Sequence, residues 1–277
     1  MVPVLKLGPF VVSSVLATLL AATWLGMEMA EREGKRHGFV RSEVSNTLSL
    51  ALAVGIIGAR LAHVARYWSS YQSDLTQVFA LTPSALDPLA GVLFGLLAAY
   101  IYLQGRQIAI ARFLDALASA LALVTAVVSF GNLLSGDAFG APAGNLPWAI
   151  ELWGERRHPS QVYEFVVALA VFVLALRYSV QHVLPAQTTE QHAVAGKATR
   201  PPFDGFLFLM TTALLAGVRL FLEAFRGDST ASFAGLRDAQ VLSLLILLAA
   251  LWLLARNLKV TAAPSLAGEK ADAEARL

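Results

Sequence analysis

The stretch HPSQVYEFVVALAVFVLAL, residues 158–176, joins a dense polar cluster to the start of a long apolar segment. Five of its first seven side chains are polar, and Pro159 suits the first turn of a helix, where a backbone N–H has no partner. Polar groups at a membrane boundary are costly, and free amide N–H groups at a helix start favour an anion. The stretch therefore predicts a membrane helix whose mouth is either an ordinary polar cap or one wall of a binding site.

The whole chain has the composition of an integral membrane protein. Of its 277 residues, 57% are hydrophobic and 14% are charged. A helix that crosses a bilayer needs about 20 mostly apolar residues, and seven stretches meet this requirement. We therefore predict an all-α fold with seven transmembrane helices. The predicted spans cover residues 9–29, 44–65, 87–103, 113–134, 161–183, 203–225 and 239–257.

Lysine and arginine indicate the orientation, because the cytoplasmic segments of membrane proteins are enriched in them. With the N-terminus outside, the segments placed inside hold 13 of these residues and the segments placed outside hold 6. We therefore predict an outer N-terminus and a cytoplasmic C-terminus. In this orientation residues 158–164 lie at the outer face of the membrane.

The chain is predicted to form a single membrane domain over residues 1–260. Residues 261–277, rich in Ala, Lys and Glu, are predicted to form a flexible cytoplasmic tail. The polar segment 184–202 is predicted to be an inside loop. Segment 135–158 mixes Gly, Pro and Asn with Trp, a composition that predicts a loop or re-entrant element at the outer interface.

Composition excludes several classes of site. The chain has no cysteine, so it can form no disulfide, no thiolate metal site and no cysteine nucleophile. A net charge of +2 gives no indication of nucleic-acid binding. We predict no metal and no cofactor.

The charged residues that fall within the predicted spans are few, and each costs a few kcal/mol to insert. Arg60 lies in the second span. Arg219 and Glu223 lie in the sixth, and Arg226 follows at a spacing that puts all three on one helical face. Two arginines with one glutamate leave an excess of positive charge, which suits a phospholipid phosphate. The alternative is a structural Arg219–Glu223 ion pair, with Arg226 reaching the outer headgroups.

Taken together, these segments resemble the prolipoprotein diacylglyceryl transferase family. Residues 158–164 are similar to the family's HPSQLYE, and GARL at 58–61 is similar to its GGR[IL]. The segment VRLFLEAFR at 218–226 resembles its FR-x-x-x-E-x-x-R. Gly131-Asn132 followed by Ser135-Gly136 resembles the end of its GR-x-GNF-x-NGE. The match covers nearly the whole chain in the right order.

The resemblance implies a multi-pass protein of the bacterial inner membrane with seven spans and an outer N-terminus. It implies transfer of a diacylglyceryl group from phosphatidylglycerol to the thiol of a lipobox Cys, so the expected partners are a phospholipid and prolipoprotein signal peptides. The candidate catalytic residues are His158, Glu164 and Glu223. The candidate phosphate-binding residues are Arg60, Asn132, Gln161, Tyr163, Arg219 and Arg226.

Several positions depart from the family's pattern, and the second Asn and the Glu of NGE are replaced near Ser135 and Asp137. Val15 falls near its first-span Tyr, Leu89 near the His of its third-span HGG, and Ser129 at the Arg of GR-x-GN. Losing a general base or one charge-stabilising donor costs a factor of about 10²–10⁴ in rate.

These departures leave two hypotheses open. The chain is either a diacylglyceryl transferase or a catalytically silent, phospholipid-binding homologue that serves as a membrane subunit or scaffold of a larger complex. A transporter is disfavoured, because the sequence has no internal repeat and its polar residues gather toward one face.

Overall fold

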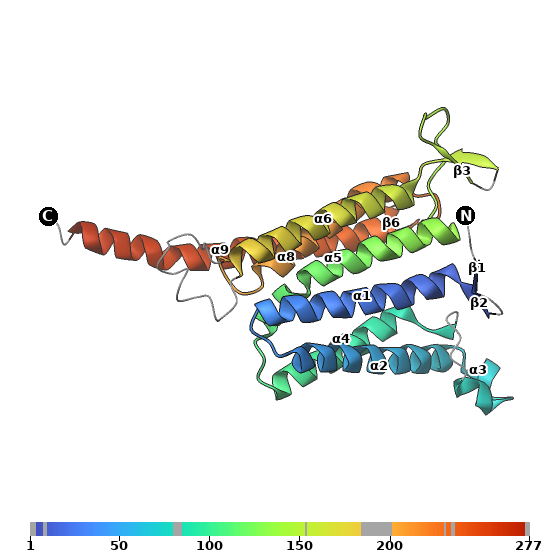
Figure 1. The fold of residues 1–277 in the computed structure, drawn as a ribbon, viewed down its shortest axis with the longest axis horizontal. Coiled ribbons are helices and arrows are strands. Elements are labelled where there is room, and N and C mark those ends of the chain that lie inside the picture. Colours follow the sequence, from blue (N-terminus) through green and yellow to red (C-terminus); the bar gives the residue numbers. More distant parts are fainter. Residues whose placement is uncertain are drawn as a thin grey trace. The chain divides into compact units, whose positions relative to one another are not determined.

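Seven long helices make up most of the computed structural model, which describes residues 4–7, 10–79, 85–152, 154–183, 201–229, 231–233 and 236–274 (Figure 1). They are α1 (Ser14–Arg36), α2 (Arg41–Arg66), α4 (Pro88–Gly105), α5 (Ile110–Ser135), α6 (Ser160–His182), α8 (Phe206–Leu222) and α9 (Asp238–Glu274). Within the described residues, six of them, all except α1, are long and apolar enough to cross a membrane. This confirms the prediction of an all-α, multi-pass membrane protein.

The first helix begins later than the sequence predicted. The predicted span started at residue 9, but β1 (Val4–Leu7) and β2 (Phe10–Ser13) pair as an antiparallel hairpin, and α1 starts only at Ser14. Ser13 ends the hairpin and caps the helix, because its Oγ accepts a hydrogen bond from the N–H of Leu16 at 3.2 Å. The second half of α1 carries charged residues, among them Glu28, Arg32 and Glu33.

The described chain forms two compact units, which are taken separately below. One unit spans residues 39–113 and contains α2, α4, the short α3 (Trp68–Tyr71) and the 3-10 turn η1 (Leu75–Phe79). The other comprises residues 1–38 and 114–277 and contains α1, most of α5, α6, α8 and α9.

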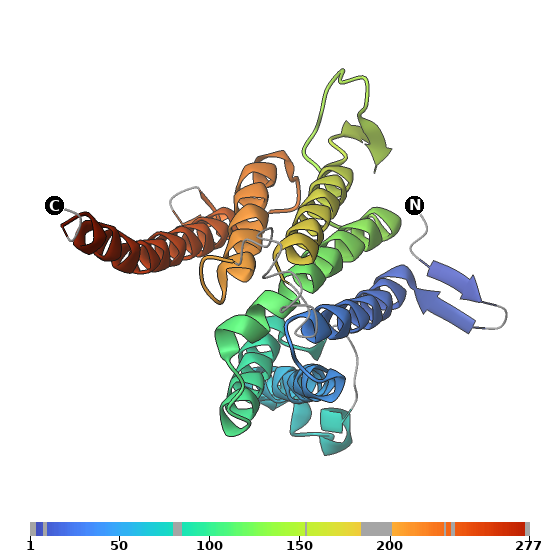
Figure 2. The same cartoon turned by 60° about the vertical axis from the view of Figure 1, so that its left-hand side comes forward.

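In the 39–113 unit, α2 and α4 lie side by side with their backbones in close contact (Figure 2). A Cβ atom added at Gly95 of α4 would stand 2.8 Å from the carbonyl oxygen of Ala51, and one at Gly55 would stand 3.0 Å from that of Gly91. Small residues allow this approach, which is a common way for membrane helices to associate in the absence of a hydrophobic driving force.

In the other unit, α5 presents a buried face of small residues to its neighbours. The residues of this face are Ala116, Ala118, Ser119, Ala122 and Ala126. Near its N-terminal end, Asp115 accepts hydrogen bonds from the N–H groups of Gly205, at 2.6 Å, and Phe208, at 2.9 Å. A side chain of α5 therefore supplies the N-terminal cap of α8, where Gly205 itself has a left-handed backbone and no capping side chain.

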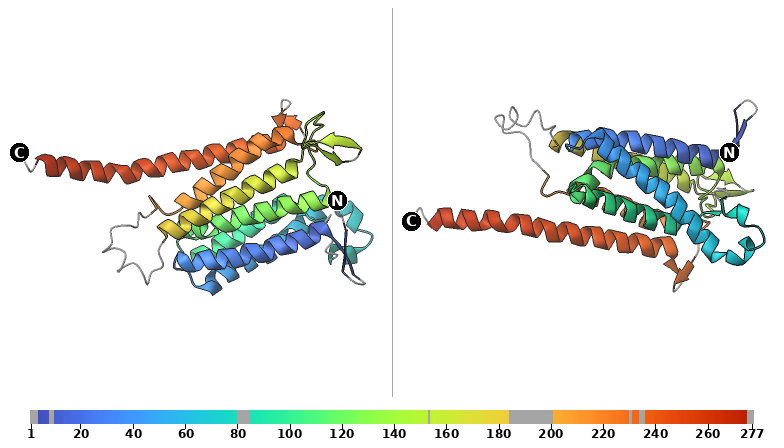
Figure 3. Two further views of the ribbon diagram at one scale, coloured as in Figure 1. Left: turned by 45° about the horizontal axis from the view of Figure 1, so that its top comes forward. Right: turned by 90° about the horizontal axis from the view of Figure 1, so that it is seen from below.

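The C-terminal helix α9 runs without a break from Asp238 to Glu274 (Figure 3). Its backbone therefore stays helical into the segment for which the sequence predicted a flexible tail. The single domain over 1–260 and the tail over 261–277 stay predictions. The predicted inside loop falls almost wholly outside the described residues.

The segment predicted as an outer loop, 135–158, contains one short hairpin. Strands β3 (Ile150–Leu152) and β4 (Glu155–Arg157) pair antiparallel and lead directly into α6. The backbone between α5 and this hairpin has three left-handed residues, Gly136, Ala138 and Gly144, and the first two directly follow the end of α5.

Candidate functional site

The heptapeptide 158–164 forms the entry to α6. Ser160 and Gln161 are fully buried. The Ser160 hydroxyl donates to the carbonyl oxygen of Ala138 at 2.8 Å, and the Gln161 amide donates to that of Asp137 at 2.9 Å. The Oε1 atom of Gln161 is buried with no hydrogen-bond partner among the described residues. Ser160 and Gln161 thus hold the backbone that follows α5 in place, and the Oε1 atom of Gln161 remains available as an acceptor.

A narrow backbone segment, 139–141, lies between the start of α6 and the end of α8. The N–H of His158 donates to the carbonyl of Ala141 at 3.0 Å, and the N–H of Ala141 donates to that of Phe225 at 2.8 Å. A Cβ atom at Gly140 would clash with the carbonyl oxygen of His158, so only glycine fits there. This segment ties the two helix ends that carry the candidate site residues.

Glu164 joins the two arginines of the α8 end. Its Oε1 atom lies 2.6 Å from a terminal nitrogen of Arg219 and 3.1 Å from one of Arg226. Arg219 also pairs with Glu223, at 2.9 Å, across one helical turn. The spacing in the sequence correctly placed Arg219, Glu223 and Arg226 together, and the structure adds Glu164 from α6. Glu223, on the 3-10 turn η4 (Glu223–Phe225), is almost completely buried.

Two further residues, Asp228 and Arg237, complete this ion-pair cluster. Both carboxylate oxygens of Asp228 accept hydrogen bonds from Arg226, one from Nε at 3.0 Å and one from a terminal nitrogen at 2.8 Å. Arg237 donates to the backbone carbonyls of Glu223 and Arg226, and the Ser229 hydroxyl donates to the Glu223 carboxylate.

The cluster therefore contains three arginines and three carboxylates. The excess positive charge expected from the sequence is absent from it, because the sequence count included neither Glu164, which comes from another helix, nor Asp228, which follows the apolar stretch. Burial disfavours the charge of Arg226, but its contacts with Asp228 and Glu164 outweigh this and raise the pKa of Arg226.

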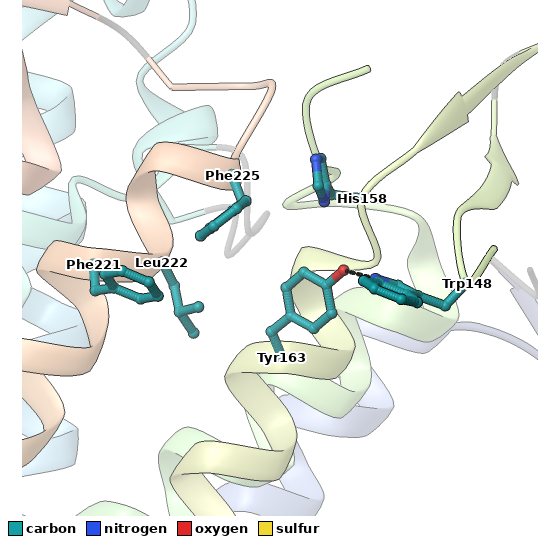
Figure 4. A pocket seen from close by; sticks show the side chains of 6 residues that line it. All are labelled: Trp148, His158, Tyr163, Phe221, Leu222 and Phe225. Atoms are coloured by element: carbon teal, nitrogen blue, oxygen red, sulfur yellow. Dashed lines mark hydrogen bonds between the residues drawn. The ribbon is translucent and has the colours of Figure 1, made fainter. Parts of the chain in front are cut away.

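An open, mostly apolar hollow of about 350 Å³ lies at the same end of this unit (Figure 4). Its lining residues are Trp148, His158, Tyr163, Phe221, Leu222 and Phe225. Trp148 donates a hydrogen bond from its indole N–H to the Tyr163 hydroxyl at 2.8 Å. The Nδ1 atom of His158 is buried and has no hydrogen-bond partner among the described residues. The hollow thus offers aromatic surface, a phenol and an imidazole ring.

Arg60 belongs to the 39–113 unit and has a different environment. Its guanidinium donates to the carbonyl oxygens of Val78 and Ala85, each at 2.9 Å, and to that of Gln77. It also lies over the ring of Tyr71, with its central carbon 5.3 Å from the ring centroid. Arg60 is buried, so it holds the loop that follows α2 in place.

The remaining predicted positions contribute less. Asn132 is half-buried near the end of α5, and its side chain makes no hydrogen bond within the described part of the chain. Ser129 is buried in the same helix, whereas Leu89, in the first turn of α4, is 69% exposed.

Sequence reasoning missed Asp228, Ser229 and the Trp148–Tyr163 contact. A short acid-containing turn directly after Arg226 was the one available signal. Among the described residues, no group of His, Asp and Glu side chains is arranged to hold a metal ion.

Comparison with known proteins gives a consistent result. The family model for prolipoprotein diacylglyceryl transferase matches residues 3–256. A phosphatidylglycerol–prolipoprotein diacylglyceryl transferase of Clostridioides difficile strain 630 is 30% identical over 221 residues, covering 80% of this chain and 81% of the relative. Proteins of the same name from Finegoldia magna and Trichormus variabilis are 27% and 29% identical, over 81% and 87% of this chain and 83% and 84% of theirs. These comparisons give no support to a catalytically silent membrane subunit.

Proposed function

Because the chain belongs to the prolipoprotein diacylglyceryl transferase family, we propose that it transfers a diacylglyceryl group from phosphatidylglycerol to the thiol of a lipobox Cys in a prolipoprotein. The observation that carries this proposal is the family match over residues 3–256, together with relatives whose names specify both substrates. The ion-pair cluster at the end of α8 supports it by providing guanidinium groups near a membrane boundary.

The proposed reaction is a substitution at carbon. The sulfur of the acceptor Cys forms a bond to the terminal carbon of the diacylglyceryl group, and the bond from that carbon to the phosphate oxygen breaks. Glycerol phosphate leaves with the bonding electron pair, and the thiol proton passes to a base. The protein must therefore stabilise negative charge on the leaving phosphate and accept one proton.

Arg219 is the proposed phosphate partner. Its side chain is 35% exposed, against 11% for Arg226, and its Nε has no hydrogen-bond or ion-pair partner among the described residues. A guanidinium can present two parallel N–H groups to a phosphate. Glu164 and Glu223 are then assigned to hold this guanidinium in place, and Arg60 to hold the loop after α2.

His158 is the proposed proton acceptor, because its ring lies in the wall of the hollow and its buried Nδ1 atom has no hydrogen-bond partner among the described residues. Tyr163, from the first turn of α6, lines the same hollow, and Gln161 has an acceptor without a partner among the described residues. These assignments place the acceptor thiol beside His158 and the headgroup beside Arg219.

The topology belongs to the same proposal. We propose that α1 is a seventh span, that the N-terminus lies outside, and that the protein resides in the bacterial inner membrane. The distribution of Lys and Arg supports this orientation, with 13 in the segments placed inside and 6 in those placed outside.

The test is direct transfer by the purified full-length protein. Mixed micelles of detergent and phosphatidylglycerol are incubated with a synthetic lipobox peptide, and mass spectrometry measures the gain of one diacylglyceryl group on Cys. A peptide with Ser in place of this Cys is the matched control and is expected to stay unmodified. Absence of product at high protein concentration would contradict the proposal and favour the silent homologue.

A further inference from the structure

The Asp228 carboxylate occupies the guanidinium of Arg226. Both of its oxygens are used, one on Nε at 3.0 Å and one on a terminal nitrogen at 2.8 Å. The other terminal nitrogen of Arg226 donates to Glu164 at 3.1 Å. All three nitrogens of Arg226 therefore already face protein carboxylates, and its side chain is only 11% exposed.

Arg219 differs from Arg226 in both respects. Its two terminal nitrogens contact Glu164 and Glu223, but Nε has no hydrogen-bond or ion-pair partner among the described residues, and the side chain is 35% exposed. Each terminal nitrogen carries two hydrogens, so hydrogens remain free there as well. A phosphate can thus approach Arg219 without displacing a carboxylate. At Arg226, Asp228 already covers the edge formed by Nε and one terminal nitrogen, so a two-pronged phosphate contact on that edge would have to displace Asp228.

A continuous chain of ion pairs links these groups. Asp228 holds Arg226, Arg226 and Arg219 share the Oε1 atom of Glu164, and Glu223 holds Arg219 from the other side. If Asp228 is lost, Arg226 is free to draw Glu164 toward itself or to turn away, and either movement changes the position of Arg219.

We propose that Asp228 is a positioning residue for the headgroup-binding arginine. It fixes the side chain of Arg226, which in turn holds the Glu164 carboxylate in position. Arg219 alone then presents its guanidinium to the phosphate of phosphatidylglycerol. This inference rests on the proposed transferase function and deepens it, because it assigns different roles to two arginines that the sequence treats alike.

The test is a double-mutant cycle on the purified full-length protein. Asp228→Asn is expected to raise KM for phosphatidylglycerol about tenfold, the usual size for a lost charge-assisted hydrogen bond, and to leave KM for the lipobox peptide unchanged. Asp228→Glu is expected to recover most of the loss. In an Arg226→Gln background, Asp228→Asn is expected to have no further effect, because Asp228 acts only through Arg226.

Glu155→Gln is the matched control. Glu155 also pairs with an arginine two residues away, Arg157 at 2.6 Å, but this pair lies outside the cluster and Glu155 is 54% exposed. KM for phosphatidylglycerol is expected to stay at the wild-type value. Thermal unfolding of each variant in detergent shows whether it is folded. If Asp228→Asn does not fold, Arg226→Lys replaces it, since lysine keeps the charge but cannot form the two-pronged contact, and the same rise in KM is expected.

Several outcomes would overturn the inference. One is an unchanged KM for phosphatidylglycerol in folded Asp228→Asn, or in Arg226→Lys where that variant replaces it. Others are additive effects of the Asp228 and Arg226 substitutions, and an equal rise in KM for both substrates. Absence of turnover in the wild-type protein would instead contradict the transferase function itself, so the two failures are distinguishable.

Discussion

Arg60 and the Arg219–Arg226 pair were predicted to bind the same phosphate, but their surroundings differ. Arg60 donates to three backbone carbonyl oxygens and has no carboxylate partner among the described residues. Arg219 and Arg226 are neutralised by carboxylates, and part of Arg219 remains accessible. Arg60 is thus enclosed by neutral carbonyl groups, whereas Arg219 is paired with carboxylates but remains partly accessible.

The comparison shows that availability of N–H groups, more than net charge, decides which arginine can take a ligand. Neutral carbonyls can saturate a guanidinium as completely as an anion does, because the hydrogen bonds are what a buried polar group requires. A motif match therefore identifies the position of an arginine in the sequence. Its hydrogen-bond partners decide whether it can bind a ligand or only stabilises the fold.

Arg219→Gln is expected to have the largest effect. Removing the accessible guanidinium takes away the proposed phosphate donor and leaves Glu164 and Glu223 with less compensation. A loss of about 10²–10³ in kcat/KM is expected, the usual cost of removing one charge-stabilising donor. Initial rates of peptide lipidation measure it. Arg219→Lys is the control and should recover part of the rate, because it keeps the charge without the fork. Near-wild-type activity in Arg219→Gln would remove the distinction between the two regions.

Arg60→Gln is expected to have the second largest effect, a loss of folding stability. The substitution leaves the carbonyls of Gln77, Val78 and Ala85 with fewer donors, at a cost of about 2 kcal/mol in unfolding free energy. Thermal unfolding in detergent measures this loss, and KM for phosphatidylglycerol of the folded protein is expected to stay constant. A raised KM with unchanged stability would show that Arg60 binds lipid after all.

Glu164→Gln tests whether this carboxylate holds arginines or exchanges protons. The amide weakens two ion pairs, so a rise of about tenfold in KM for phosphatidylglycerol is expected. The shape of the pH–rate profile is expected to match that of the wild-type protein. Loss of one limb of that profile would instead identify Glu164 as an acid or base.

Trp148→Phe is expected to have the smallest effect. It removes one hydrogen bond, to the Tyr163 hydroxyl, at an exposed position and keeps the aromatic surface of the hollow. A loss of about threefold in kcat/KM is expected, corresponding to the lower range for a neutral hydrogen bond. Tyr163→Phe removes the same bond from the other side and should give a similar loss. A much larger loss in either variant would give this contact a direct part in the reaction.

Much of the fold was predictable because apolar length is a strong signal. Six predicted spans correspond to helices of suitable length and composition, and the entry of α6 at Ser160 follows the proline as expected. The start of α1 was mispredicted because Phe10–Ser13 is apolar enough to extend a span, and hydrophobicity alone cannot separate a strand from the first turn of a helix.

The site was only partly predictable. Helical spacing predicted that Arg219, Glu223 and Arg226 lie together, because residues three or four apart in a helix are always neighbours. The contribution of Glu164 depends on how α6 packs against α8, and that of Asp228 on a turn after the helix ends. Neither contact has a fixed separation along the chain, so no periodic pattern reveals it.

The cap that Asp115 places on α8 has a consequence for the order in which the protein assembles. The first turn of α8 obtains its hydrogen bonds from a side chain of α5, and α5 precedes it by about 90 residues in the chain. During synthesis α5 is therefore already present when α8 emerges. Docking of the later helix on the earlier one completes both the bonding of α8 and the pairing of the Asp115 carboxylate, so membrane integration of α8 is coupled to tertiary contact.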